Sequence, residues 1–187
     1  MGLLTIIRKQ RRKEKEMRIL MLGLDNAGKT TIVRRLKGGL DLSTVMPTLG
    51  FNIDTIIHKS YSLNIWDIGG QRTLRPYWKN YFESTDAIIW VIDSTDRDRL
   101  SDTMMELNEL ISEERLAGAS LLVFANKQDL TGAMSTEEIK LALDLRSLPI
   151  GRRWCVLACS AISGLNVMEG LDWVVEEVAS RLYLLQK

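Results

Sequence analysis

The chain has 187 residues, of which 45% are apolar and 26% are charged, so it can form one hydrophobic core and is too apolar to be disordered. Its 25 Lys and Arg almost balance its 24 Asp and Glu, which excludes a nucleic-acid-binding surface over the whole protein. No run of about 18 apolar residues is present, so we expect no membrane-spanning helix.

Basic residues concentrate near the N-terminus. Residues 8–18 contain seven Lys or Arg and two Glu, a net charge of +5, which leaves −4 for the rest of the chain. Four apolar residues precede them: Leu3, Leu4, Ile6 and Ile7. An apolar stripe beside a basic run is typical of an amphipathic helix that adsorbs to surfaces. We therefore expect a basic N-terminal helix at 1–16, at most weak membrane contact through it, and one domain at 17–187.

Apolar runs and helical patterns alternate along the rest of the chain. Buried-type strands are predicted at 18–23, 87–93, 120–125 and 154–160, and an antiparallel hairpin at 51–58 and 61–67. Helical spacing joins Leu100, Met104, Leu107 and Ile111, and Ser135 with Glu138 forms the pattern of a capped helix start. This alternation predicts an α/β fold, a mainly parallel sheet with helices on both faces.

A phosphate-binding loop is predicted directly after the first strand. The segment from Gly23 to Thr30, GLDNAGKT, fits the pattern G-x-x-x-x-G-K-[ST]. Its glycines let successive backbone N–H groups point at phosphate oxygens, and the following helix adds the positive end of its dipole. Lys29 is expected to reach the β- and γ-phosphates, and the Thr30 hydroxyl to bind Mg²⁺. The residues assigned to the phosphate site are Gly23, Asp25, Asn26, Ala27, Gly28, Lys29, Thr30 and Thr31.

The tetrapeptide NKQD, Asn126 to Asp129, lies where a predicted strand ends, at the sheet edge where α/β folds bind ligands. The Asp129 carboxylate can accept hydrogen bonds from N1–H and the 2-amino group of guanine, a pair that adenine lacks. A buried carboxylate left unpaired is costly, and sites of this type reject the wrong partner by about 10⁴–10⁵-fold. Asn126 would tie the loops together and approach N7, while the Lys127 stem packs on the base. Ser160 and Ala161 end the last strand, where the Ala161 N–H is placed to meet O6.

Further predictions concern the metal and the attacking water. In WDIGGQ, Asp67 fits the carboxylate that holds Mg²⁺ through water, the Gly70 N–H can bond the γ-phosphate, and Gln71 can orient the attacking water. Thr48 lies 18 residues after Thr30, and its hydroxyl is expected on the same Mg²⁺. The expected metal ligands are therefore Thr30, Thr48 and Asp67, and the expected catalytic residue is Gln71.

These segments together resemble the small GTPases and, within them, the Arf and Arf-like family. The spellings GLDNAGKTT, PTLGFN, WDIGGQ and NKQD are those of that family, and the resemblance extends from Met1 to about Tyr183. It implies a P-loop small-GTPase fold, with a six-stranded, mostly parallel sheet and one antiparallel edge strand. It also implies a GTP/GDP switch that uses Mg²⁺, in which the hairpin 51–67 slides in register as the N-terminal helix is released.

Unaided GTP hydrolysis is expected to be slow. Only 17 residues separate Thr30 from Thr48, which leaves no room for the inserted domain that carries an arginine in the related Gα subunits. A GTPase-activating partner must therefore supply an arginine or an equivalent group.

The resemblance also implies effectors. Phe51, Trp66 and Tyr81 match the aromatic triad with which the GTP forms of the family meet their effectors. Strand alternation places Trp66 on the face opposite Leu63 and Ile65, so we expect an exposed contact for it rather than a core position. Likeness to the branch linked to tubulin folding implies two effector classes, tubulin-folding cofactor D and carriers of lipidated cargo.

Position 6 departs from the pattern of Arf proper. Gly2 is present, but the myristoylation pattern M-G-x-x-x-[ST] requires Ser or Thr where Ile6 stands. We therefore expect a chain without a myristoyl group, soluble in the cytoplasm, with a minor mitochondrial or centrosomal pool by resemblance.

Two other interpretations stay open to a test. A small P-loop nucleotide kinase would need a phosphoacceptor pocket and a basic lid; the sequence offers neither, and segments 67–71 and 126–129 would go unexplained. A nucleotide-occupied scaffold in a chaperone complex, with little functional turnover, would use the same residues as a switch. The lone His58 is expected at the surface rather than as a metal ligand.

Overall fold

The structure, a computed structural model, describes residues 15–39, 45–148 and 151–183. The expected N-terminal helix at 1–16 therefore lies outside the described residues except at its last two positions, and Glu16 already begins the first strand. No helix of the described part is long and apolar enough to cross a membrane.

Six strands and four α-helices are described. The strands are β1 (Glu16–Leu22), β2 (Phe51–His58), β3 (Tyr61–Ile68), β4 (Ala87–Asp93), β5 (Ser120–Asn126) and β6 (Trp154–Ala158). The helices are α2 (Lys29–Leu36), α3 (Leu100–Ser112), α4 (Thr136–Ala142) and α5 (Val167–Tyr183). Short 3₁₀ helices are η2 (Arg75–Tyr81), η3 (Glu114–Leu116) and η4 (Leu145–Ser147).

The strands form one sheet in the order β2-β3-β1-β4-β5-β6. Every neighbouring pair is parallel except β2 and β3, which are antiparallel, so the edge strand predicted from the family resemblance is β2. The predicted hairpin is confirmed, with His58 paired to Tyr61 and left-handed backbone at Lys59 and Ser60 (φ 45° and 68°). Two positive φ angles are typical of the type I′ turn that joins two-residue hairpins.

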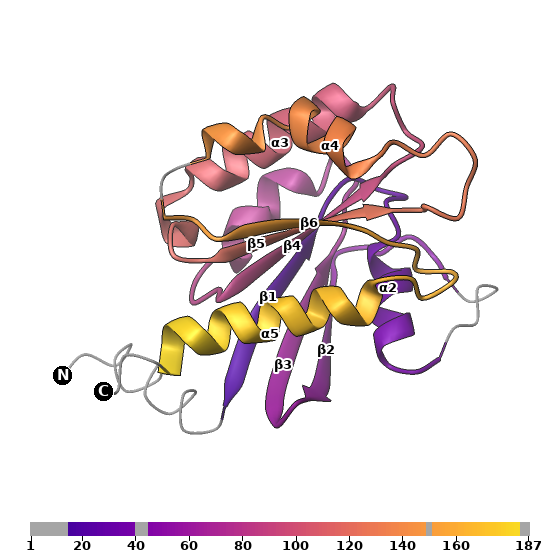
Figure 1. The fold of residues 1–187 in the computed structure, drawn as a ribbon. Helices are drawn as coiled ribbons and strands as arrows, with labels where there is room; N and C mark the ends of the chain where they lie inside the picture. Colours follow the sequence, from indigo (N-terminus) through magenta and orange to yellow (C-terminus); the bar gives the residue numbers. More distant parts are fainter. Residues whose placement is uncertain (1–14, 40–44, 149–150, 184–187) are drawn as a thin grey trace.

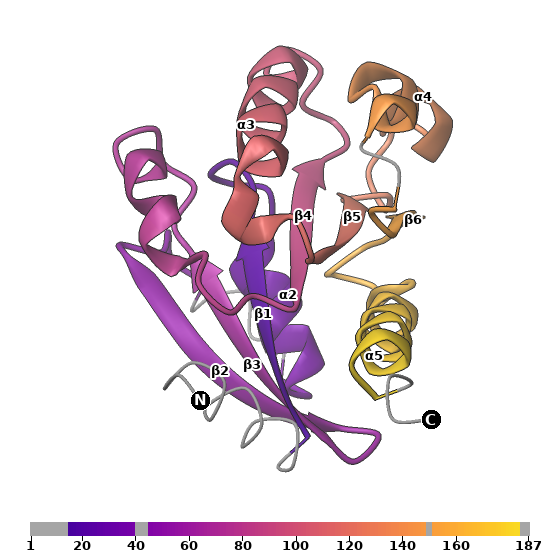
Figure 2. The same ribbon diagram turned by 90° about the vertical axis from the view of Figure 1, so that its left-hand side faces the viewer.

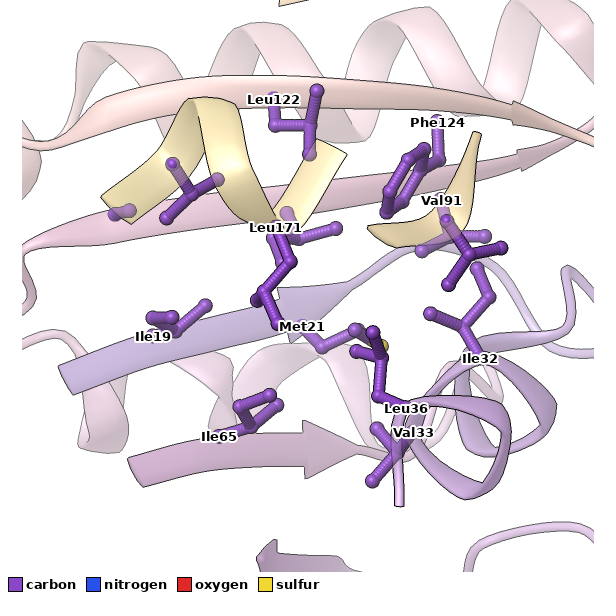
Figure 3. Packing of buried hydrophobic residues seen from close by; sticks show 14 of the residues in the cluster. Ile19, Met21, Ile32, Val33, Leu36, Ile65, Val91, Leu122, Phe124 and Leu171 are labelled. Carbon is purple, nitrogen blue, oxygen red and sulfur yellow. The ribbon is translucent and has the colours of Figure 1, made fainter. Parts of the chain in front are cut away.

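Helices cover both faces of the sheet, as predicted. Alternate residues of β1 point to opposite faces: Met17, Ile19 and Met21 join one hydrophobic cluster, and Leu20 and Leu22 the other. The first cluster lies under α2 and α5, and the second under α3, α4 and the 3₁₀ helices (Figure 1, Figure 2). Figure 3 shows part of the first cluster, in which side chains of β1, β3, β4 and β5 meet those of α2 and α5.

The centre of the sheet is more deeply buried than its β2 edge. All seven residues of β4 and of β5 are buried, as expected for central strands covered on both faces. Five of the eight residues of β2 are exposed. The hairpin end of β2 is nevertheless held against α5, because His58 Nε2 lies 2.7 Å from Asp172 Oδ1 and Lys59 pairs with the same carboxylate. His58, which we expected at the surface, is therefore half-buried and paired.

Candidate functional site

The segments singled out by sequence come together at one edge of the sheet. Residues 23–28 follow β1, 69–71 follow β3, 126–129 begin at the last residue of β5, and 159–161 follow β6. The carboxyl ends of parallel strands meet at the same edge, which explains why segments so far apart in the chain become neighbours. A cavity of about 310 Å³ opens at this edge. It is lined by Asp25, Asn26, Gly28, Lys29, Thr30, Thr31, Val45, Met46, Pro47, Thr48, Gly69, Gly70 and Gln71.

The phosphate loop curls around the Lys29 ammonium group. Lys29 is only 6% exposed, and its Nζ donates hydrogen bonds to Gly23 O at 2.9 Å and Leu24 O at 2.8 Å. Burial lowers the pKa of Lys29 to about 8, although attraction to Asp67 and Asp25 opposes this shift. An ammonium group has three donors, so Nζ could contact a phosphate in the cavity while it keeps contact with the loop.

Gly28 allows the phosphate loop to approach residues 126–129. These residues, which are expected to contact the base, form the base-side loop. Its backbone is left-handed, with φ of 95°, and a Cβ atom there would lie 2.3 Å from Asn126 Nδ2. Only glycine fits this position without displacing Asn126.

Two of the three expected metal ligands, Thr30 and Thr48, line the cavity, and both contact the buried carboxylate of Asp67. Thr30 Oγ1 lies 2.8 Å from Thr48 Oγ1 and 2.6 Å from Asp67 Oδ2, and Thr48 Oγ1 lies 3.4 Å from the same carboxylate oxygen. Burial raises the pKa of Asp67, against hydrogen bonding from Thr30 and the charge of Lys29. The other carboxylate oxygen, Oδ1, is buried and has no hydrogen-bond partner among the described residues.

This donor set fits a hard cation such as Mg²⁺. Two hydroxyls and a carboxylate with a free oxygen supply only oxygen, and Mg²⁺ commonly takes one or two protein groups together with phosphate oxygens and water. In the described part of the chain, no group of three or more His, Cys, Asp or Glu side chains could hold a metal by itself. A metal at this site would therefore depend on the hydroxyls and on the phosphates of a ligand.

Gly70 and Gln71 line the cavity beside the phosphate loop. A Cβ atom on Gly70 would lie 2.3–2.5 Å from Gly23 O, Leu24 C and Asp25 N, so the Gly70 backbone is packed directly on that loop. Gln71 lines the cavity, and its Oε1 atom is buried without a hydrogen-bond partner among the described residues. An amide oxygen without a partner could accept a hydrogen bond from water if the side chain turned toward the cavity.

Asn126 joins the base-side loops to the phosphate loop. Its Nδ2 donates to Ala27 O at 2.8 Å, and its Oδ1 accepts from the Ala161 N–H at 3.0 Å. The N–H that we expected to meet guanine O6 is thus engaged by Asn126 in this structure. Asp129 accepts from Ser160 Oγ at 2.6 Å, which leaves its second carboxylate oxygen available.

Two residues of the base-side loop have surroundings that differ from those expected from the sequence. Asp129 is exposed, although we expected its carboxylate to be buried; the group would become buried only under a base. The Lys127 ammonium forms an ion pair of 2.6 Å with Asp93 Oδ2 at the end of β4. Burial opposes ionisation of Asp93, but hydrogen bonds from Lys127 and Thr95 hold its pKa below the usual range. The ammonium end of Lys127 is therefore fixed, and its aliphatic stem remains available to pack against a flat ligand.

Sequence reasoning missed an arginine cluster around Asp25. Arg99 Nη1 donates to Asp25 Oδ1 at 3.0 Å and Arg99 Nη2 to Asp25 O at 3.2 Å, while Arg75 Nη2 lies 3.7 Å from Asp25 Oδ1. No motif joins these positions, because their contact arises from the packing of η2 and α3 beside the phosphate loop.

The three aromatic residues expected at an effector surface form one cluster. Ring centroids of Phe51 and Trp66 are 5.5 Å apart, those of Phe51 and Tyr81 5.1 Å, and those of Trp66 and Tyr81 5.8 Å. The Arg18 guanidinium lies 3.9 Å above the Trp66 ring. Trp66 is on the predicted face of β3 but is half-buried, because Arg18 and the other two rings cover much of it. Phe51 is the most open of the three, at 43% exposed.

Known proteins are similar to this chain in sequence and in fold. Residues 3–178 match the model of the ADP-ribosylation factor family. The chain is 58% identical to ADP-ribosylation factor-like protein 2 of Arabidopsis thaliana and 60% identical to that of Dictyostelium discoideum, each over 185 residues that cover 99% of this chain and 100% of the relative. It is 53% identical to ADP-ribosylation factor-like protein 3 of Chlamydomonas reinhardtii, over 95% of this chain and 99% of that protein.

A solved structure agrees with these relatives. The Arl6 BBS3 small GTPase from Trypanosoma brucei, with the bound nucleotide analogue GppNp, superposes with a TM-score of 0.81 at 30% identity. The match covers 88% of this chain and 98% of that one. The six-stranded sheet with its antiparallel edge pair, the matched family model and the full-length relatives agree: the chain belongs to the ADP-ribosylation factor family, as an Arf-like small GTPase.

Proposed function

We propose that this chain is a GTP-binding switch that hydrolyses GTP slowly without an activator and recruits effectors while GTP is bound. The observation that carries the proposal is the contact of Thr30 and Thr48 with each other and with Asp67, beside the cavity that the phosphate loop and Gln71 line. These three residues come from separate segments, so a ligand that engages all three couples the loop before β2 to the end of β3.

The roles of the phosphate-side residues follow from their chemistry. Thr30, Thr48 and Asp67 would hold Mg²⁺, which when bound neutralises charge on the β- and γ-phosphate oxygens. Lys29 would bind the β- and γ-phosphates, and the Gly70 N–H would bind the γ-phosphate. Gln71 would orient the attacking water through its unpaired Oε1 atom. Loss of the γ-phosphate would remove the partner of Gly70 and weaken the hold on Thr48.

The base-side residues support selection of guanine. Asp129 keeps one carboxylate oxygen outside its bond to Ser160, and two donors on one edge of guanine would pair with that carboxylate. Asn126 would hold the base loops in register with the phosphate loop. Lys127, anchored on Asp93, would pack its stem on the base.

Effector recruitment is assigned to the aromatic cluster of Phe51, Trp66 and Tyr81. It lies on β2, β3 and η2, close in sequence to both Thr48 and Gln71, so a change at the γ-phosphate can reach it through short stretches of chain. By resemblance to the tubulin-linked branch, the partners are tubulin-folding cofactor D and carriers of lipidated cargo, with a GTPase-activating protein to stimulate hydrolysis. The same resemblance, with Ile6 in place of Ser or Thr, assigns a cytoplasmic protein without a myristoyl group.

Calorimetry tests the nucleotide assignment. GDP and a non-hydrolysable GTP analogue should bind in the presence of Mg²⁺, whereas ATP should compete weakly. Asp129→Asn should lose affinity for guanine nucleotides and gain affinity for xanthine nucleotides, because an amide can donate to the carbonyl that replaces the 2-amino group. Asp98→Asn, at an exposed position before α3, is the matched control. Equal competition by ATP would overturn the proposal.

Effector capture tests the switch itself. Protein loaded with the GTP analogue should retain tubulin cofactor D or a lipidated-cargo carrier, and protein loaded with GDP should not. Capture that ignores the nucleotide, together with no stimulated turnover in single-turnover assays with candidate activators, would favour the nucleotide-occupied scaffold instead.

A further inference from the structure

The two glycines that precede Gln71 have both of their carbonyl oxygens held by side chains of η2. Trp78 Nε1 donates to Gly69 O at 2.9 Å, and Arg75 Nε donates to Gly70 O at 3.0 Å. Trp78 is buried, and the Arg75 side chain is 9% exposed. The segment that carries the expected catalytic residue is therefore tied to η2 at two consecutive peptide groups.

These two bonds also set the direction of the neighbouring N–H groups. A peptide group is planar, so the carbonyl of one residue and the N–H of the next lie in one plane and point in opposite directions. Trp78, by holding Gly69 O, orients the Gly70 N–H. Arg75, by holding Gly70 O, orients the N–H of Gln71 and the start of its side chain.

Arg75 is itself fixed from two other elements. Its Nη1 lies 2.9 Å from Glu106 Oε1 on α3, and its Nη2 lies 3.7 Å from Asp25 Oδ1 on the phosphate loop. One guanidinium therefore links the Gly70 carbonyl, α3 and the phosphate loop. The planar fork of arginine can reach three separated partners at once, whereas the ammonium group of lysine acts from a single point.

Gln71 has few anchors of its own. Its side-chain Oε1 atom has no hydrogen-bond partner among the described residues, while its backbone carbonyl accepts from the N–H groups of Leu74 and Arg75 at 2.8 and 3.3 Å. Glycine at position 70 adds backbone freedom just before it. The orientation of Gln71 thus depends on groups that hold its backbone, and Arg75 supplies the side-chain bond nearest to it.

We propose that Arg75 is a positioning residue for GTP hydrolysis, which holds the Gly70–Gln71 peptide group against the phosphate loop by linking Gly70 O to Glu106 and Asp25. Arg75 acts through Gln71 rather than on the phosphates. The inference rests on the proposed function, because it assigns Gln71 to the attacking water. Losing Arg75 should slow the chemical step more than it weakens nucleotide binding.

The test compares Arg75→Lys with Arg72→Lys, a control in the same segment. Arg72 is exposed and forms no hydrogen bond or ion pair with the described residues. Three quantities are measured for each variant: the single-turnover rate constant for GTP hydrolysis, the dissociation constant for GDP, and the Tm. Arg75→Lys should lower the rate constant roughly 10- to 100-fold, the effect of one lost charge-assisted hydrogen bond that the transition state needs, with roughly 3-fold or smaller changes in GDP affinity. Arg72→Lys should leave all three quantities unchanged.

A charge swap separates positioning from simple stabilisation. The double variant Arg75→Glu with Glu106→Arg can restore an ion pair between η2 and α3, but it places an acceptor beside Gly70 O. We expect Tm to recover relative to Arg75→Glu alone, while the hydrolysis rate stays low.

Three results would overturn the inference: wild-type rates for Arg75→Lys, recovery of both Tm and rate in the swap, or equal losses in rate and GDP affinity. If Arg75→Lys does not fold, Glu106→Gln replaces it, with a smaller rate loss expected and a wild-type rate counted against the proposal. A wild-type protein that binds no guanine nucleotide would instead refute the proposed function.

Discussion

Replacing Asn126 by alanine should weaken both the fold and nucleotide binding, because this side chain connects the base-side loops with the phosphate loop. Asn126 is 1% exposed. Its Nδ2 donates a hydrogen bond to Ala27 O at 2.8 Å, and its Oδ1 accepts one from the Ala161 N–H at 3.0 Å. Both partner residues are buried as well. Alanine would leave one backbone carbonyl and one backbone N–H without a partner.

The expected magnitude follows from these two groups. A buried polar group without a partner costs about 1–3 kcal/mol, so two such groups cost about 2–6 kcal/mol, with the lower values if water replaces the amide. In a chain of this length, 1 kcal/mol corresponds to about 2–4 °C, so Tm should fall by roughly 4–24 °C. GDP affinity should fall in parallel, because both loops that would contact the nucleotide lose their common support.

Thermal unfolding with and without Mg²⁺ and GDP, together with calorimetry, measures both effects. Asn108→Ala is the matched control: Asn108 is exposed on α3, and its side chain forms no hydrogen bond with the described residues. That change should alter stability by less than about 0.5 kcal/mol. Similar losses in the two variants would refute the idea that Asn126 holds the two halves of the site together.

Three further outcomes are expected. Gln71→Leu should keep its GTP affinity but lose activator-stimulated hydrolysis, because leucine cannot orient water; stimulated single-turnover rates equal to wild type would contradict this. Thr30→Asn should weaken Mg²⁺–GTP binding more than GDP binding in nucleotide competition with and without EDTA; equal losses would argue against a metal ligand. Lys59 and His58 hold the pKa of Asp172 below its usual range, so their stabilisation is present above an ordinary carboxylate pKa of about 4 and is lost as the pH falls through the lowered value. Asp172→Asn should therefore lower Tm at about pH 7, and the difference from wild type should shrink as the pH falls below about 4; a difference that does not shrink would contradict the pairing.

Most of the fold could be predicted, because each buried strand carries a short apolar run, α3 has a helical spacing and α4 begins with a capping pattern. The sheet, the two-residue hairpin and the capping box at Ser135, with its reciprocal bonds to Glu138, are confirmed. Strand ends were less accurate. β1 begins at Glu16, two residues before the predicted start, because it already pairs with Ser62 of β3. Because charged residues precede the apolar run, the sequence pattern does not indicate that the strand begins before that run.

The candidate site also has a part that could be predicted from the sequence and a part that could not. Residues such as Lys29 and Gln71 could be assigned to one site from the sequence because they belong to contiguous motifs, and the structure places both at the same cavity. Arg75 and Arg99 were missed because they reach Asp25 from η2 and from the start of α3, and only packing brings those elements together. His58 was misjudged for a related reason: its partner, Asp172, lies 114 residues away on α5.

The uneven burial of the sheet has a consequence for how the molecule can fluctuate. β4 and β5 contribute to both hydrophobic clusters, so neither strand can open without exposing most of the interior. Among the described strands, β2 pairs with β3 alone, and most of its residues are exposed, so it can separate as a small cooperative unit. Amide exchange at β4 and β5 should accordingly track global unfolding, whereas that of β2 should be governed by local opening.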